Sequence, residues 1–258
     1  MNAAEATALR VVELTRSFGG LRALEGVSFD VRPGELFGIV GPNGAGKTTL
    51  LNCISGVDPP ESGSIWLGDR RLTGIAAHRV AALGVARTFQ SADFFGELTV
   101  QDYVMVGCVP RASSSVLASG LGLRSARRTE REETGVVLDL LEEFNLIGAA
   151  SVRLENLPYG TRKIVDIVRA LNARPRVLLL DEPTSGTSAE DRISIRDLLS
   201  KIKSQGVSIL VVDHDIRFIS DTCDRLLAMN FGKRLGLGVP AEVLNMPDVV
   251  ASYLGPAQ

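Results

Sequence analysis

Short apolar runs of strand length recur along the chain, and segments with helical spacing follow them. Three continuous apolar runs are typical of strands buried on both faces: Leu36–Val40, Val177–Leu180 and Val207–Val212. Apolar residues at helical spacing come after each run, within Thr48–Gly56, Ser188–Ser204 and Ile216–Cys223. Strands and helices that alternate in this way predict an α/β fold with a parallel sheet.

Shorter β-rich segments accompany this core, separated by glycine and proline turn signals. Around the first buried run they predict an N-terminal antiparallel β region, formed by Leu9–Thr15, Ala23–Val31 and Ser64–Leu67. Near the C-terminus, Leu226–Asn230 and Lys233–Val239 predict a closing hairpin, and Pro240–Leu254 predicts a short helical segment.

The middle of the chain departs from the alternating pattern. A helix is predicted at Ile75–Leu83 and an edge strand at Arg87–Gln90, and residues 99–170 are mainly helical apart from a predicted loop at Arg111–Ser125. We therefore predict a single domain, in which residues 1–90 and 163–258 form the α/β core with its β region. Residues 91–162 are predicted to form an inserted helical subdomain.

The composition limits the possible partners. With 28 Lys and Arg against 30 Asp and Glu, the formal net charge is −2, which argues against a dedicated nucleic-acid binder. The three cysteines are far apart and include no CxxC pair, as is typical of free thiols in a reducing compartment. No apolar stretch reaches the ~18 residues of a membrane span, so we expect the chain to meet a membrane only through a partner.

A glycine-rich loop after the first buried run fits the phosphate-binding pattern G-x-x-x-x-G-K-[ST]: Gly41-Pro42-Asn43-Gly44-Ala45-Gly46-Lys47-Thr48. The glycines let backbone N–H groups converge on phosphate oxygens, and the following helix adds its N-terminal dipole. Lys47 is expected to reach the β- and γ-phosphates, and the Thr48 hydroxyl to bind Mg²⁺. We therefore predict a P-loop NTPase core in which this loop and Thr49 bind ATP or a similar nucleotide. The motif alone fits kinases, GTPases, helicases and transport ATPases.

Two acidic residues end the second buried run. Asp181 and Glu182 follow Val177–Leu180, at the strand end where α/β sheets bind ligands. Asp181 is the expected Mg²⁺ partner, directly or through water. Glu182 points elsewhere and is predicted to polarise the water that attacks the γ-phosphate. The alternative for this pair alone is a solvated strand end followed by the turn at Pro183-Thr184.

With both motifs placed, nearly the whole chain resembles the ATP-binding cassette (ABC) ATPases, whose core is RecA-like. Further matches come in the family's order: Phe18, Gln90, the signature segment Leu157-Pro158-Tyr159-Gly160-Thr161, and His214. The resemblance implies that Phe18 stacks on adenine, that Gln90 contacts Mg²⁺ or water and senses the transporter, and that His214 holds the γ-phosphate end of the site. It also implies that two cassettes close head to tail around two ATP molecules, so that Tyr159 and Gly160 contact the partner's nucleotide.

Two positions depart from the family pattern. Pro158 stands where the common signature L-S-G-G-Q has serine, and Ser188 replaces the acid that usually ends S-G-L-D. Proline removes a hydroxyl and an N–H, although it is compatible with the first turn of a helix. Both positions serve the partner's site, whereas Lys47, Glu182 and His214 serve this chain's own site and are intact. We therefore hypothesise a heterodimer with two unequal ATP sites.

Several segments extend the resemblance to the ATPases of branched-chain amino acid importers: Arg16–Leu24, Asn52-Cys53, Arg87–Gln90, Tyr159-Gly160, Gly238–Val243 and Pro247–Gly255. The resemblance implies a peripheral subunit on the cytoplasmic face of the inner membrane. Such a subunit acts with integral membrane permeases, a second ABC ATPase and, indirectly, a solute-binding protein. Relatives in this group carry amino acids, urea or other small molecules, so the cargo stays open.

Other classes of ATPase explain the sequence less well. A non-transport cassette of the DNA-repair or translation kind needs a long coiled-coil insertion or a second cassette, but only about 70 residues separate Gln90 from the signature. A small-molecule P-loop kinase leaves both the signature and His214 unexplained.

Overall fold

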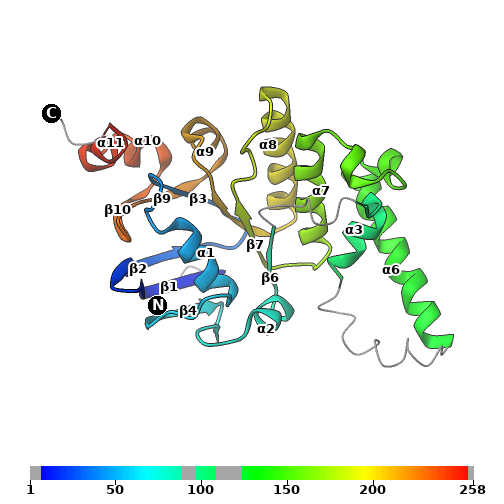
Figure 1. The fold of residues 1–258 in the computed structure, drawn as a ribbon, viewed down its shortest axis with the longest axis horizontal. Helices are drawn as coiled ribbons and strands as arrows, with labels where there is room; N and C mark the ends of the chain where they lie inside the picture. The colour runs from blue at the N-terminus through cyan, green and yellow to red at the C-terminus, as the bar shows by residue number, and fades with distance from the viewer. Residues whose placement is uncertain (1–6, 89–96, 109–123, 255–258) are drawn as a thin grey trace, which may run out of the picture.

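A six-stranded sheet with the order β10-β9-β3-β8-β7-β6 forms the centre of the computed structural model, which describes residues 7–88, 97–108 and 124–254 (Figure 1). The strands are β3 (Leu36–Val40), β6 (Val85–Arg87), β7 (Val177–Asp181), β8 (Ser208–Val212), β9 (Arg225–Asn230) and β10 (Lys233–Gly238). All pairs are parallel except the hairpin β9–β10. The predicted parallel α/β core and its closing hairpin are therefore confirmed.

The strand at the edge of this sheet corrects one prediction. We expected it at Arg87–Gln90, but β6 covers Val85–Arg87 and pairs with β7. The buried side chains of Val85 and Ala86 fix this register, because they pack into the core opposite Val177 and Leu178. Gln90 lies outside the described residues.

A second, antiparallel sheet with the order β2-β1-β4-β5 confirms the predicted N-terminal β region. Its strands are β1 (Leu9–Phe18), β2 (Leu21–Val31), β4 (Ser62–Leu67) and β5 (Arg70–Arg71). This sheet lies on one face of the six-stranded sheet, and α1 (Lys47–Ser55) lies beside both (Figure 1). The apolar side chains of α1, including Leu50, Leu51 and Ile54, share one buried cluster with both sheets.

Side chains of the parallel strands alternate between two apolar clusters, as the pleat requires. Phe37 and Ile39 of β3 point to the cluster under α1, whereas Leu36 and Val40 point to the opposite cluster. Four of the helices on that opposite face are α8 (Ala189–Ser204), α9 (Ile216–Thr222), α10 (Pro240–Val243) and α11 (Pro247–Leu254). The predicted C-terminal helical segment is thus two short helices.

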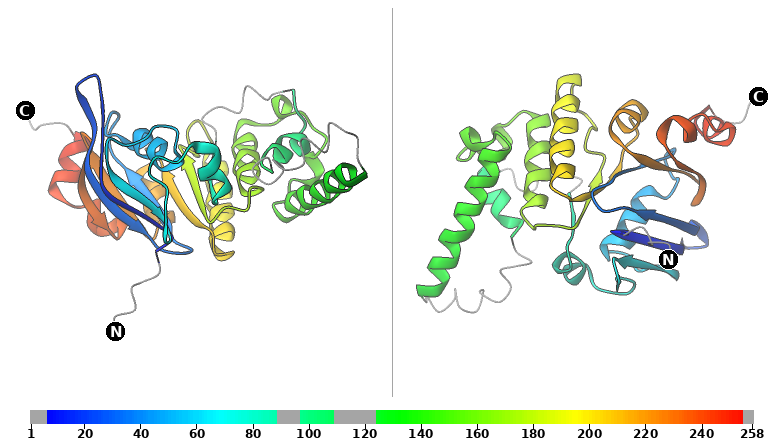
Figure 2. Two further views of the ribbon diagram at one scale, coloured as in Figure 1. Left: turned by 90° about the horizontal axis from the view of Figure 1, so that it is seen from below. Right: turned by 180° about the vertical axis from the view of Figure 1, so that it is seen from behind.

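A helical group lies at the end of the molecule away from the antiparallel sheet (Figure 2). It contains α3 (Val100–Val106), α6 (Arg124–Glu143) and α7 (Tyr159–Leu171), with 3-10 turns at Ile147–Ala149 and Leu154–Asn156. The helical middle of the chain is thus as predicted. However, α6 begins at Arg124, so the last two residues of the predicted loop Arg111–Ser125 are helical, and residues 109–123 lie outside the described part.

The helical group shares its apolar cluster with the core of the sheet. Tyr103 of α3 and Val137 of α6 belong to the same buried cluster as Leu178 and Leu180 of β7. Helix α7 runs unbroken through residues 162 and 163, where we predicted the subdomain to end. Among the described residues, α2 (Ala77–Ala82) completes the α-helices, and none of these helices is long and apolar enough to cross a membrane.

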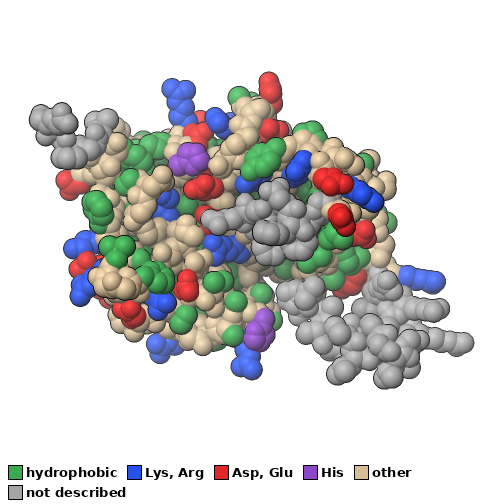
Figure 3. All heavy atoms as spheres, viewed as in Figure 1, with side chains coloured by type: hydrophobic (Ala, Val, Ile, Leu, Met, Phe, Trp, Pro, Cys, Tyr) green, Lys and Arg blue, Asp and Glu red, His purple; other side chains and the backbone are tan. Residues whose placement is uncertain are grey.

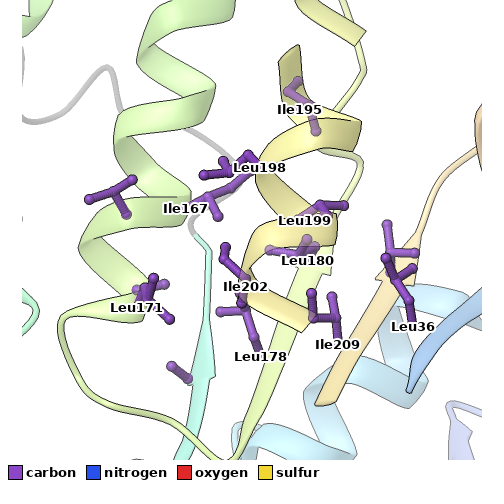
Figure 4. Close-up of a cluster of buried hydrophobic side chains, with 14 of the residues drawn as sticks. Leu36, Ile167, Leu171, Leu178, Leu180, Ile195, Leu198, Leu199, Ile202 and Ile209 are labelled. Carbon is purple, nitrogen blue, oxygen red and sulfur yellow. The ribbon is translucent and has the colours of Figure 1, made fainter. Parts of the chain in front are cut away.

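Leu199 offers a direct test of how strongly α8 is held on the sheet (Figure 4). Its side chain is fully buried in the cluster that joins α7, α8 and β7. We expect Leu199→Ala to lower the free energy of unfolding by about 2–5 kcal/mol, because it removes buried methyl groups and leaves a cavity. Denaturant unfolding of the purified protein measures this change.

Ile193 on the same helix is the matched control, since about half of its side chain is exposed. Ile193→Ala should change the free energy of unfolding by no more than about 0.5 kcal/mol. Equal losses for the two variants would contradict the packing of α8 described above.

Candidate functional site

The topology brings the ends of three parallel strands together at one edge of the central sheet. Strand β8 pairs with β3 on one side and with β7 on the other. The glycine-rich loop follows β3, Asp181 is the last residue of β7, and Asp213 follows β8. Ligand sites of open α/β sheets lie at this carboxyl edge.

The glycine-rich loop is closed on one side and open on the other. Gly46 has a φ of 97°, and a Cβ at this position would collide with the carbonyl oxygen of Ala23 on β2. Gly44 has a φ of 81°, but a Cβ there would meet no atom within 4 Å. The loop therefore packs against β2 at its end, while its centre is accessible to a ligand.

Lys47 extends from α1 back over this loop. Its Nζ donates to the carbonyl oxygens of Gly41 at 2.6 Å and Pro42 at 3.0 Å. Burial lowers the pKa of the Lys47 ammonium from its usual value, and three nearby carboxylates offset part of this shift. The carboxylates are those of Glu182, Asp181 and Asp213. Neutral acceptors thus hold a cation where phosphate oxygens would approach.

The two aspartates at the sheet edge are buried and have different partners. The Oδ2 atom of Asp181 accepts a hydrogen bond from Arg87 at 2.9 Å. Asp213 accepts from the backbone N–H of Thr184 at 3.1 Å, from its hydroxyl at 2.7 Å, and from the N–H of Asp215 at 3.0 Å. Asp213 therefore fixes the loop after β7.

Glu182 has a backbone conformation that is uncommon for a residue with a side chain. Its φ is 49°, and its N–H donates to the carbonyl oxygen of Val212 at 2.8 Å. The side chain is directed away from the core and is 42% exposed. The Nδ1 atom of His214 lies 3.9 Å from Glu182 Oε2, too far for a hydrogen bond but within reach of a shared ligand. The structure therefore brings Glu182 and His214 together at the mouth of the site.

The predicted signature segment starts α7, and it packs against the loop after Glu182 in the same chain. Pro158 is the N-cap residue of α7, one position before the first turn in which we expected it. A Cβ at Gly160 would collide with the carboxyl group of Asp191 on α8, so close packing requires a glycine here. Lys163 lies over the ring of Tyr159 and donates to the carbonyl oxygen of Glu182 at 3.4 Å.

Ser188 retains a structural role in spite of its departure from the family pattern. It is the N-cap of α8, where its hydroxyl accepts from the N–H of Asp191 while the Asp191 carboxylate accepts from the N–H of Ser188. This reciprocal pair is a capping box. Serine and aspartate are both good N-cap residues, so the replacement conserves the start of this helix.

The remaining predicted contacts lie around this edge or outside the described residues. Phe18 is at the end of β1, 44% exposed, with the Arg16 guanidinium 4.7 Å from its ring centre. Thr48 is exposed in the first turn of α1, and Thr49 is half-buried there. The predicted role of Gln90 cannot be placed, because this residue lies outside the described part.

Oxygen donors for Mg²⁺ are present at this edge of the sheet. Among the residues that the structure describes, no group of three or more His, Cys, Asp and Glu side chains could hold a metal ion. Mg²⁺ does not need such a cage, since it is commonly bound by one or two carboxylates, waters and substrate phosphates. Asp181 and the Thr48 hydroxyl fit this pattern of Mg²⁺ binding. The described residues do not supply the His and Cys ligands of a structural transition-metal site.

Two polar residues of the site were not predicted from the sequence. Arg87 was noted only as part of a motif, although it is the ion-pair partner of Asp181. Asp213 was not predicted to be a site residue, although it directly follows the apolar run of β8. Asp181 has the same place at the end of the apolar run of β7. An acidic residue after a second buried parallel strand was the available signal for Asp213. No local signal identifies the partner of Arg87, because 94 residues separate the two side chains.

Known proteins resemble the chain over nearly its full length. Residues 24–185 match the family model described as ABC transporter. The chain is 35% identical over 250 residues to the high-affinity branched-chain amino acid transport ATP-binding protein BraF of Pseudomonas aeruginosa, covering 96% of this chain and 98% of that protein. It is 34% identical to the corresponding protein LivG of Escherichia coli K12, with the same coverage.

The fold also matches solved structures. A crystal structure described as a nucleotide-free ATP-binding cassette from an ABC transporter superposes with a TM-score of 0.87 at 28% sequence identity. The match covers 96% of this chain and 99% of that chain.

Gly46 and Gly44 provide a matched pair for testing the loop. Gly46→Ala should lower both the free energy of unfolding and the affinity for nucleotide, because the added Cβ meets the carbonyl of Ala23 and the left-handed backbone is strained. Gly44→Ala adds only the backbone strain, about 1–2 kcal/mol. Denaturant unfolding and binding of a fluorescent ATP analogue measure the two effects. A Gly46 variant as stable as the Gly44 variant would refute the close packing on β2.

Proposed function

The chain belongs to the ABC transporter family, and we propose that it hydrolyses ATP to energise the uptake of branched-chain amino acids through membrane permeases. The observation that carries this proposal is the convergence of Lys47, Asp181, Glu182 and His214 at one edge of the central sheet. Phosphoryl transfer to water needs a cation that binds phosphate, a carboxylate that binds Mg²⁺ and an exposed carboxylate that accepts a proton from water. Lys47, Asp181 and Glu182 supply these groups in that order.

Nucleotide binding is expected to use the glycine-rich loop and α1. Backbone N–H groups of the loop and the N-terminal end of α1 favour an anion at the centre of the loop. Lys47 already lies over this loop, so its ammonium needs only to exchange carbonyl partners for phosphate oxygens. We further propose that Phe18 contributes an exposed aromatic face for adenine.

Water activation is assigned to Glu182. Its carboxylate is more exposed than that of Asp181. Among the described residues, no Lys or Arg nitrogen lies within hydrogen-bond distance of this carboxylate. It is therefore suited to accept a proton from an attacking water, while His214 orients the γ-phosphate end. Mg²⁺, held by Asp181 and Thr48, would offset the negative charge of the phosphates.

A second ABC ATPase is the proposed partner across the nucleotide. The exposed ring of Tyr159 and the start of α7 would face the ATP held by that partner. Integral membrane permeases, and a solute-binding protein acting through them, would complete the importer. The chain would then act at the cytoplasmic face of the inner membrane, as a peripheral subunit.

Branched-chain amino acids are the proposed cargo because the similar proteins BraF and LivG are branched-chain amino acid transport proteins. Urea or another small solute is the alternative cargo, since no residue of an ATP-binding subunit contacts the solute in this scheme. Uptake of labelled leucine and of labelled urea by cells, with and without an inactive version of this chain, distinguishes the two.

Glu182→Gln tests the assigned water activation. We expect the rate of Mg·ATP hydrolysis to fall about 100-fold or more, because the amide accepts no proton, while ATP affinity is retained. Phosphate release and binding of a fluorescent ATP analogue, measured on the same preparation, separate the two effects. In cells, the same variant should abolish leucine uptake.

Glu242→Gln is the matched control. Glu242 is exposed on α10, in a depression that it shares with Gly34 and Glu35 at the other end of the central sheet. Its substitution should leave hydrolysis unchanged. Retained hydrolysis in Glu182→Gln would overturn the assignment, and loss of ATP binding would indicate that Glu182 has a structural role instead.

The departures at Pro158 and Ser188 generate a further prediction. Because Pro158 has no N–H at the start of α7, this chain's signature should stabilise the partner's ATP less well than a standard signature does. In a heterodimer, Glu182→Gln in this chain should therefore reduce turnover more than the equivalent change in the partner. Turnover of the assembled transporter with one substitution at a time measures this, and equal losses would argue against unequal sites.

A further inference from the structure

Arg87 joins three elements around the carboxylate of Asp181. One terminal guanidinium nitrogen donates to Asp181 Oδ2 at 2.9 Å. The other donates to Asn52 Oδ1 at 2.7 Å and to Ser55 Oγ at 3.3 Å, both on α1. The guanidinium thus connects the end of β7 to the helix that follows the glycine-rich loop, and its planar fork fixes the direction of both contacts.

Burial makes this contact energetically important. The side chain of Asp181 is 1% exposed and that of Arg87 is 19% exposed. An ionised carboxylate at such a position needs a charged partner, and removal of one member of a buried pair leaves the other uncompensated. Charge-assisted hydrogen bonds of this kind also restrict the rotation of the carboxylate.

The position of Arg87 is itself restrained by its backbone. Its carbonyl oxygen accepts a hydrogen bond from Arg169 on α7 at 2.9 Å, and Arg169 is paired with the buried Asp166. The next residue, Thr88, donates its N–H to Leu179 on β7 at 3.1 Å. The backbone of Arg87 can therefore not shift without breaking hydrogen bonds to α7 and β7.

We propose that Arg87 is a positioning residue that orients the Asp181 carboxylate for the Mg²⁺ of the bound nucleotide. The proposal rests on the proposed function, in which Asp181 helps to hold Mg²⁺. Partners that hydrogen-bond a metal-ligating carboxylate set its direction, and their loss typically weakens metal binding about 10–100-fold. The positive charge of Arg87 acts in the opposite sense, because it repels a cation, so the experiment must separate geometry from charge.

The experiment measures how Mg²⁺ changes the binding of a fluorescent ATP analogue to the full-length protein, with EDTA as the metal-free reference. Arg87→Met should require about tenfold more Mg²⁺ for half of the effect. Arg87→Lys keeps the charge but lacks the fork, so it should also weaken Mg²⁺ binding, though less. Affinity for the analogue in EDTA should be unchanged in both variants. A general loss of structure would lower this affinity as well, so the EDTA measurement separates the two causes.

Arg225→Met is the matched control. Arg225 is a partly buried arginine that pairs with Asp30 and Glu35 near the amino end of β3. Its substitution should lower thermal stability without changing the dependence on Mg²⁺. If Arg87→Met does not fold, as judged by circular dichroism, Arg87→Lys decides alone.

Asp181→Asn distinguishes a failure of the role of Arg87 from a failure of the proposed function. Loss of the Mg²⁺ effect in Asp181→Asn, with a normal effect in the Arg87 variants, would overturn the role of Arg87 and leave the proposed function intact. An unchanged Mg²⁺ effect in Asp181→Asn would overturn both. Tighter Mg²⁺ binding in Arg87→Met would show that charge repulsion outweighs orientation, which also overturns the proposal.

Discussion

Parallel pairing of β8 with β3 and with β7 is the constraint on which the candidate site depends. In this register Ile39 lies opposite Val212, and Val212 lies opposite Asp181. The residues that follow these three positions must therefore leave the sheet at the same edge, whatever else the chain does. All residues of these three strands are buried, so packing on both faces of the sheet fixes their positions.

The same edge also receives α7 from the helical group. Gly160 packs against Asp191, and Lys163 reaches the carbonyl oxygen of Glu182, so the start of α7 is tied to the loop that carries Glu182. In the last turn of this helix, Arg169 donates a hydrogen bond to the carbonyl oxygen of Arg87. The helix whose first residues are proposed to face the partner's ATP thus contacts both the loop that carries Glu182 and the backbone of Arg87.

Much of this arrangement could be predicted from the sequence, because it depends on local patterns. The glycine-rich loop, the acid after a buried run and the alternating elements each have a signal within a few residues. The end of β6 and the partner of Arg87 could not be predicted in this way. An edge strand of three residues is defined by its pairing with β7, and Arg87 meets Asp181 only in the folded chain. The prediction for Gly160 was also incomplete, since it did not include the packing of this residue against Asp191. That packing depends on the contact between α7 and α8.

Three carboxylates gather near one lysine at this edge, and their different partners argue for different roles. Acidic and basic side chains are interspersed over the face seen in Figure 3, and the formal net charge of the chain is only −2. Neither sign of charge therefore dominates this face. Selectivity must come from local contacts instead. Asp213 is occupied by hydrogen bonds from the loop after β7, and Asp181 is paired with Arg87. Glu182 is exposed and lies 3.9 Å from His214. It is therefore the carboxylate of the three that is best placed to accept a proton from water.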